Sequence, residues 1–189
     1  MANFTVVYDA CLFYPAPLRD LMIRLAQTRR FRAHWTEAIQ REWLIALLRN
    51  RPELDEIKLS RTMTLMNQAV PDCLITGYEY LTEQLSLPDP NDRHVLAAAI
   101  RCGAQAIVTM NVKDFPAETL ASFEIFARHP DDFILDLADL EPAVVTTAAK
   151  RQRAALKDPP LSPDEFVSKL RRQGLPGVAA FLQHEIALI

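Results

Sequence analysis

Carboxylates that are far apart in the sequence could form one acidic site in this chain. Asp89 and Asp92 flank Pro90 and Asn91 in a proline-rich loop, and the apolar run after them is typical of a helix that ends at Gly103. Asp92 has an alternative role as the N-cap of that helix, because its carboxylate can accept hydrogen bonds from free N–H groups of the first turn. No comparable capping role is expected for Asp89. Two acids this close repel each other unless a cation or a shared proton holds them.

Two further acids follow runs of residues that are typical of buried strands. Asp9 comes directly after Phe4–Tyr8, and Asp114 comes shortly after Ala104–Thr109. Asp is also common in turns, which is the structural alternative for Asp9, although the residues after it are not typical turn residues. Open α/β sheets place ligand-binding groups at the carboxyl ends of their strands. We therefore expect Asp9 and Asp114 at one edge of a sheet.

Glu42 lies in a predicted helix that begins after Thr36 and ends near Leu48. It follows Ile39 by one helical turn and precedes Trp43, so it falls at or inside the apolar face of that helix. A buried glutamate is rarely left without a partner. A salt bridge and a place in a shared acidic site are the two alternatives for Glu42.

Such a set of carboxylates, without histidine or cysteine ligands, suits Mg²⁺ or Mn²⁺. The chemistry that most often needs this kind of site is phosphodiester hydrolysis, in which the metal activates water and neutralises charge on the phosphate. The cysteines are widely spaced and lack the pairing of a zinc site: Cys11, Cys73 and Cys102. They indicate reduced thiols in a cytoplasmic protein.

The order of the predicted elements gives the fold class, which is α/β. Strand-like and helix-like runs alternate over residues 1–129, as in a three-layer α/β/α sandwich with a central parallel sheet. The expected strands are residues 4–8, 31–35, 73–76, 104–109 and 123–127. The pattern after His129 is helical, so we predict a helical C-terminal extension over residues 130–189.

The net charge of −3 is unevenly divided along the chain. Residues 1–141 carry a net charge of −6, and residues 142–189 carry +3. An acidic body does not hold nucleic acid through bulk charge alone, but it suits acids that bind a metal while basic residues arrive from the periphery. Simple solubility is the alternative. No apolar run reaches the roughly 18 residues of a membrane span, and no signal peptide is expected at the N-terminus.

In this order the residues resemble a PIN domain. The resemblance covers roughly residues 4–127 and depends on Val6–Asp9, on the helical Glu42, on Asp89–Ala99 and on Val108–Phe115. It implies the α/β/α sandwich and the activity of a Mg²⁺- or Mn²⁺-dependent ribonuclease. Many bacterial members are VapC-type toxins of toxin–antitoxin pairs, so the resemblance also implies RNA as substrate, an antitoxin partner and a homodimer.

The family's site residues carry over by position. Three residues match its central acids: Asp9, Glu42 and Asp92. The usual fourth acid stands two residues after the threonine, where this chain has Asn111, and the acid is displaced to Asp114. The implied metal ligands are Asp9, Asp92 and Asp114, with Glu42 acting through water. Asp89 and Asn111 would support the site. Because Asn111 carries no charge at the position of the usual fourth acid, the number of metal ions, one or two, stays open. Arg93 and Lys113 are candidates for contacting RNA phosphates, with surface solvation as the alternative.

Three other classes of protein share parts of this pattern. A haloacid-dehalogenase-type phosphatase needs a second Asp two residues after the first, where this chain has Cys11. A phosphate-accepting receiver domain needs paired acids after its first strand, whereas Asp9 arrives alone. Asn111 favours a third alternative, a catalytically silent PIN-like module that binds RNA or a partner.

The extension more weakly resembles one found on some VapC-like toxins. It is expected to touch RNA or the antitoxin, and deleting residues 142–189 is expected to leave metal binding mostly intact.

Overall fold

A four-stranded parallel sheet lies at the centre of the computed structural model, which describes residues 4–189. Residues 1–3, which bear on the expected absence of a signal peptide, lie outside the described residues. The strands are β1 (Thr5–Tyr8), β2 (Arg32–His34), β3 (Ala106–Val108) and β4 (Phe126–Arg128). Their spatial order is β2-β1-β3-β4, and each neighbouring pair is parallel. The carboxyl ends of all four strands therefore meet at one edge.

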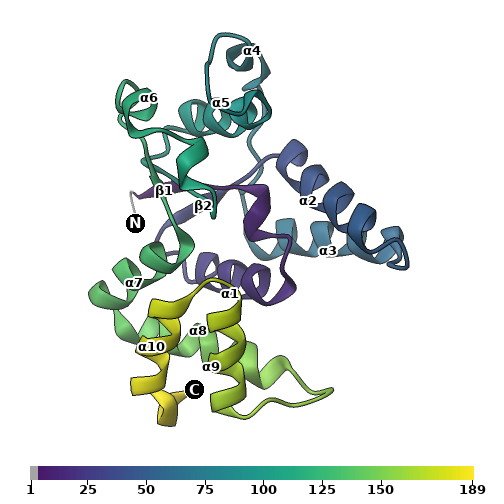
Figure 1. Ribbon diagram of the computed structural model, residues 1–189, viewed down its shortest axis with the longest axis vertical. Coiled ribbons are helices and arrows are strands. Elements are labelled where there is room, and N and C mark those ends of the chain that lie inside the picture. Colours follow the sequence, from purple (N-terminus) through teal and green to yellow (C-terminus); the bar gives the residue numbers. More distant parts are fainter. Residues whose placement is uncertain (1–3) are drawn as a thin grey trace.

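Helices cover both faces of this sheet (Figure 1). Those of the body are α1 (Ala16–Ala26), α2 (Glu37–Asn50), α3 (Glu56–Ala69), α4 (Glu79–Thr82), α5 (Arg93–Cys102) and α6 (Ala117–Ala121). Helix α5 packs on β1 and β3 from one side, and α1 lies on the other side. The predicted α/β/α sandwich with a parallel sheet is confirmed.

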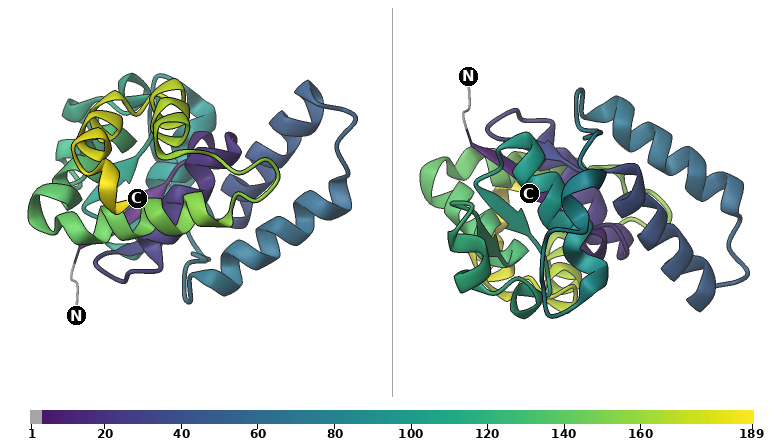
Figure 2. Two further views of the ribbon diagram at one scale, coloured as in Figure 1. Left: turned by 90° about the horizontal axis from the view of Figure 1, so that it is seen from below. Right: turned by 90° about the horizontal axis from the view of Figure 1, so that it is seen from above.

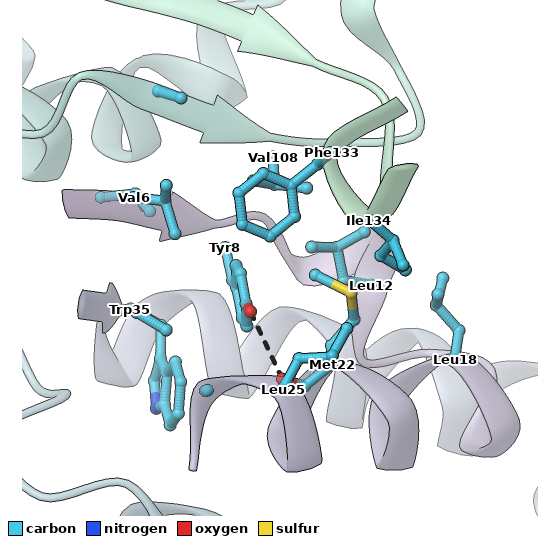
Figure 3. Close-up of a cluster of buried hydrophobic side chains, with 14 of the residues drawn as sticks. Val6, Tyr8, Leu12, Leu18, Met22, Leu25, Trp35, Val108, Phe133 and Ile134 are labelled. Atoms are coloured by element: carbon cyan, nitrogen blue, oxygen red, sulfur yellow. Dashed lines mark hydrogen bonds between the residues drawn. The ribbon is translucent and has the colours of Figure 1, made fainter. Parts of the chain in front are cut away.

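The core between β1 and α1 shows why this strand is apolar throughout. Val6 and Tyr8 point toward α1 (Figure 3), and the Tyr8 hydroxyl donates to the Met22 carbonyl oxygen at 3.3 Å. The Tyr8 ring also stacks on Trp35, with the ring centroids 6.1 Å apart. Burying side chains of this size stabilises the fold by about 1.5–3 kcal/mol each. This packing fixes β1, and with it the acid that follows it.

Helix α5 ends where the sequence predicts. Gly103 has a left-handed φ of 63°, and its N–H donates to the carbonyl oxygen of Ala99, which closes the last turn. The buried face of α5 is made of Val95 and Leu96 and the three alanines that follow. Because alanine side chains are small, the helix lies close to β1 and β3, so its first residues stay near the carboxyl edge of the sheet.

Two of the predicted strands differ in the structure. Residues 73–76 contribute only a single bridge, between Leu74 and Trp35, because Asp72 and Gly77 adopt left-handed φ values of 60° and 69° on either side. The last strand begins at Phe126 and not at residue 123, since Glu124 also has a left-handed φ of 57°. These turns end the extended backbone and leave four strands in the sheet.

The C-terminal region is helical, as predicted. It contains α7 (Pro130–Leu140), α8 (Pro142–Ala155), α9 (Pro163–Arg172) and α10 (Pro176–His184). Buried side chains from these helices belong to the same hydrophobic core as the strands.

Figure 2 shows that α2 and α3, by contrast, project from the body as an antiparallel pair. Within residues 4–189, no helix has the length and apolar composition that a membrane crossing requires.

Candidate active site

Asp9 is buried at the end of β1, and three donors hold its carboxylate. Oδ1 accepts from the backbone N–H of Ala10 at 2.6 Å. Oδ2 accepts from the Thr109 hydroxyl at 2.7 Å and from the Cys11 thiol at 3.0 Å. Asp9 also caps the short 3-10 turn η1 (Ala10–Leu12), so a turn does follow it, although its residues are not typical turn residues. The turn is what aims the carboxylate, because it presents the Ala10 N–H to Oδ1.

Thr109 and Cys11 were not among the predicted site residues. Tyr8 pairs with Val108 in the sheet, so the residues that follow them, Asp9 and Thr109, emerge side by side. That register was the signal for Thr109, whose hydroxyl also accepts from the Asn111 N–H at 3.0 Å. Burial and the charge of Asp9 raise the pKa of the Cys11 thiol, which therefore stays protonated and can donate.

The capping roles of the two loop acids are the reverse of those expected. Asp89 caps the 3-10 turn η2 (Pro90–Asp92), accepting from the Asn91 N–H at 2.8 Å. Asp92 stands at the N-cap position of α5 but makes no side-chain capping bond there. The reason is the extra turn, which puts Asp89 in the capping geometry and leaves the Asp92 carboxylate available to other groups.

Asp92 is the one carboxyl group of residues 4–189 whose pKa is clearly raised. Its pKa is raised from 3.8 to about 7, first by burial and then by the negative charges of the four other predicted acids: Asp9, Asp89, Asp114 and Glu42. Acids from four separate segments therefore act on one carboxyl group. A site of this kind holds a proton near neutral pH unless a cation neutralises it.

Glu42 was predicted to lie at or inside the apolar face of α2, and the structure does not bury it. Its side chain is 44% exposed, and its Oε1 lies 2.7 Å from Nε2 of the half-buried His94. The helix turns Trp43 into the core and leaves Glu42 at the rim, facing the first turn of α5. Both alternatives for Glu42 thus have support, since it lies beside a histidine that is a salt-bridge partner when protonated and its charge also acts on Asp92.

The remaining predicted residues lie in the loop after β3 and at the start of α5. Asp114 is half-buried in the 3-10 turn η3 (Val112–Asp114), and its N–H donates to the Asn111 carbonyl oxygen at 2.9 Å. Asn111 and Lys113 are exposed. Arg93 is half-buried, and its Nε donates to the Pro90 carbonyl oxygen at 2.8 Å, so this side chain is partly used within its own loop.

The donor chemistry of this site fits a divalent cation that prefers oxygen ligands. Among residues 4–189, no three His, Cys, Asp or Glu side chains stand close enough together to hold a metal ion as they are placed. The pKa of Asp92 is nevertheless raised by burial and by the negative charges of four other carboxylates, so negative charge gathers around this group. Mg²⁺ and Mn²⁺ bind such carboxylate oxygens and would relieve their repulsion.

Comparisons with known proteins define the class to which this fold and site belong. The PIN domain profile matches residues 5–113, and a profile described as the VapC50 C-terminal domain matches residues 130–184. The chain belongs to the PIN domain family. It is 36% identical over 126 residues to a protein of Mycobacterium tuberculosis (strain ATCC 25618 / H37Rv) named "Putative ribonuclease VapC50", an alignment that covers 65% of this chain and 74% of that protein. No solved structure matches the chain.

Proposed function

We propose that this chain is a metal-dependent endoribonuclease that hydrolyses RNA phosphodiester bonds, and that it is the toxin of a bacterial type II toxin–antitoxin pair. The observation that carries the proposal is Asp92, whose pKa is raised to about 7 first by burial and then by the charges of four other carboxylates. The PIN domain family and the ribonuclease name of the mycobacterial relative support the reaction class. The VapC-type resemblance supports the role as a toxin.

The proposed metal ligands are Asp9, Asp92 and Asp114. When bound there, Mg²⁺ or Mn²⁺ lowers the pKa of a coordinated water and neutralises charge on the phosphate and the leaving oxygen. Asp9 suits the role of a fixed ligand, because Thr109 and Cys11 already orient its carboxylate. Asp92 suits the role of a ligand that ionises when the cation binds, because its raised pKa favours the protonated form when no cation is present.

Other residues of the chain would position the reactants. Glu42, at the exposed rim, is placed to orient the attacking water, and His94 limits the orientations that the Glu42 carboxylate can adopt. Asp89 and Asn111 would support the ligands through charge and hydrogen bonding. Lys113, which is exposed, and Arg93 would contact the phosphates of the RNA on either side of the acids.

Replacing Asp92 tests this mechanism. Asp92→Asn removes a ligand charge and should reduce RNA cleavage by at least about 1,000-fold at Mg²⁺ levels that saturate the wild type, because the metal both makes the nucleophile and stabilises the leaving oxygen. The fold should survive, since the Asp92 side chain makes no capping bond that would be lost. Cleavage of a labelled single-stranded RNA is measured on gels, with Asp139→Asn on the exposed face of α7 as the matched control.

Two outcomes would contradict the mechanism: full activity of Asp92→Asn, and wild-type cleavage that EDTA does not diminish.

A second candidate function, the catalytically silent PIN-like module, is favoured by Asn111, which occupies the position of the usual fourth acid. A wild type that binds RNA and never cuts it with Mg²⁺ or Mn²⁺ would establish that alternative.

The proposed biological setting follows from the same family. We infer an antitoxin protein as partner, a homodimer as the assembly and the cytoplasm as the compartment. The proposed division of the chain is a PIN-like nuclease domain over residues 1–129 and a helical extension over residues 130–189. The separate profile matches on either side of this boundary support that division.

A further inference from the structure

The turn between α9 and α10 packs against the loop that carries the candidate site. Gly174, in this turn, has a left-handed φ of 82°, and a Cβ atom at this position would lie only 2.7 Å from the terminal methyl carbon of Met110. In Figure 1 this turn is the part of α9 and α10 nearest to the sheet. Gly174 therefore lets the extension approach a residue that directly follows Thr109.

Met110 connects this turn to the metal-ligand candidate Asp9 through a short series of contacts. The Met110 N–H donates to the sulfur of Cys11 at 3.2 Å, and the Cys11 thiol donates to Asp9 Oδ2 at 3.0 Å. Only two residues thus separate Gly174 from the Asp9 carboxylate. The carboxyl end of α9 is therefore connected to Asp9 through packed side chains, although it is far from Asp9 in the sequence.

The last turn of α9 is basic: it contains Lys169, Arg171 and Arg172. Arg171 and Arg172 are exposed, and within residues 4–189 neither guanidinium forms an ion pair or a side-chain hydrogen bond. Basic residues near a helix C-terminus are favoured by the helix dipole, which explains their presence in part. It does not explain why two adjacent exposed cations stand without partners within three residues of Gly174, which packs on Met110.

We propose that the α9–α10 turn forms one wall of the active site, and that Arg171 and Arg172 bind phosphates of the RNA strand beside the scissile bond. Arg171 precedes Gly174 by three residues, which is close to one helical turn of about 5.4 Å. An extended arginine side chain covers a comparable distance, so its guanidinium can reach RNA that lies over Met110. A guanidinium binds a phosphate through paired N–H donors and offsets the repulsion between RNA and the acids.

The inference rests on the proposed function for its substrate class, but its test does not require cleavage. Binding of a fluorescein-labelled oligouridylate of about 20 nucleotides, longer than a single-strand site of typical size, is followed by anisotropy in EDTA at several salt concentrations. Arg171→Gln/Arg172→Gln should bind on the order of tenfold more weakly than the wild type at low salt. The slope of log Kd against log salt should fall by about 1.4, because each phosphate contact on a single strand contributes about 0.7.

The matched control removes two charges from the other side of the same extension, with Lys150→Gln/Arg151→Gln. Arg151 lies with Arg30 beside a cavity of about 300 Å³ at the end of α1, where the chain enters β2 at the edge of the sheet opposite the acids. This control should retain the affinity and the salt slope of the wild type. Circular dichroism checks that both double variants are folded.

Three results would overturn the proposal. They are an unchanged affinity in Arg171→Gln/Arg172→Gln, an equal loss in the control, which would mean bulk charge alone, and a wild type that binds no RNA. The proposed hydrolysis fails on a different result, which is the absence of metal-dependent cleavage by a wild type that does bind RNA. The two ideas can therefore fail separately.

Discussion

Asp92 is a half-buried carboxyl group on which the charges of four other carboxylates act, and its titration couples the acidic site to stability. Its pKa in the folded, metal-free chain is about 7, against an ordinary value of 3.8. The folded state therefore binds this proton more tightly than the unfolded state does. The free energy of unfolding should then fall as the pH rises between these two values, and the full loss should be reached above about pH 7.

This pH dependence is measurable in EDTA by guanidinium denaturation at about pH 5 and about pH 8. Because Asp92 is half-buried and solvent screens its charge, we expect this group to lower the stability at the higher pH by on the order of 1–2 kcal/mol. Asp92→Asn should lessen the decline, and Mn²⁺ should restore stability to the wild type at about pH 8. A wild type that becomes more stable over this range, relative to Asp92→Asn, would contradict the charge repulsion inferred for the site.

At the scale of the elements, one buried carboxylate joins two helices of the extension. Asp131, in the first turn of α7, accepts hydrogen bonds from the N–H groups of Gly177 and Val178, both at 2.8 Å. These N–H groups belong to the first turn of α10, which has no side-chain cap of its own. Asp131 therefore fixes the start of α10, and with it the turn that carries Gly174.

Removing this carboxylate should destabilise the chain. Asp131→Ala leaves one buried and one partly buried N–H group without an acceptor, and we expect a loss of about 2–4 kcal/mol in the free energy of unfolding. Asp131→Asn should lose less, since its side-chain oxygen can still accept from one of them. Asp132→Ala, at the exposed neighbouring position, is the control and should have little effect. Equal stability of Asp131→Ala and Asp132→Ala in denaturant titrations would refute this role.

At the scale of the whole molecule, the extension and the body share one hydrophobic core. Val145, Phe166 and Leu182 of the extension are buried in the same cluster as Val6 and Tyr8. The side chain of Gln152 in α8 also donates to the Pro17 carbonyl oxygen at the start of α1, at 2.7 Å. The extension is therefore part of what supports α1, and α1 in turn supports β1.

This shared core changes the expectation for a truncated chain. Residues 142–189 include α8, α9 and α10, and their deletion would expose the apolar side of α1 to water. We therefore expect a chain ending at residue 141 to lose its cooperative thermal transition and its Mn²⁺ binding. Circular dichroism measures the thermal transition, and calorimetry measures Mn²⁺ binding. Retention of both by the shortened chain would restore the sequence-based expectation that the extension is dispensable for the site.

The sequence by itself determined the layered fold, and it named most residues of the candidate site. Apolar runs such as Thr5–Tyr8 and small-residue helices such as α5 are local patterns, and a buried parallel strand or a glycine-terminated helix follows directly from them. Asp9, Asp92 and Asp114 stand at the ends of these patterns. Their common edge could be predicted because parallel strands all place their carboxyl ends on the same side of a sheet.

Only the tertiary structure decided how each of these residues is used. Asp89 and not Asp92 became the cap, because an extra 3-10 turn precedes α5. The contacts of Thr109 with Asp9, of His94 with Glu42 and of Gly174 with Met110 join segments far apart in the chain. Such contacts depend on strand register, helix rotation and the path of the turns. Local sequence patterns do not specify these quantities, because they arise only when the whole core packs.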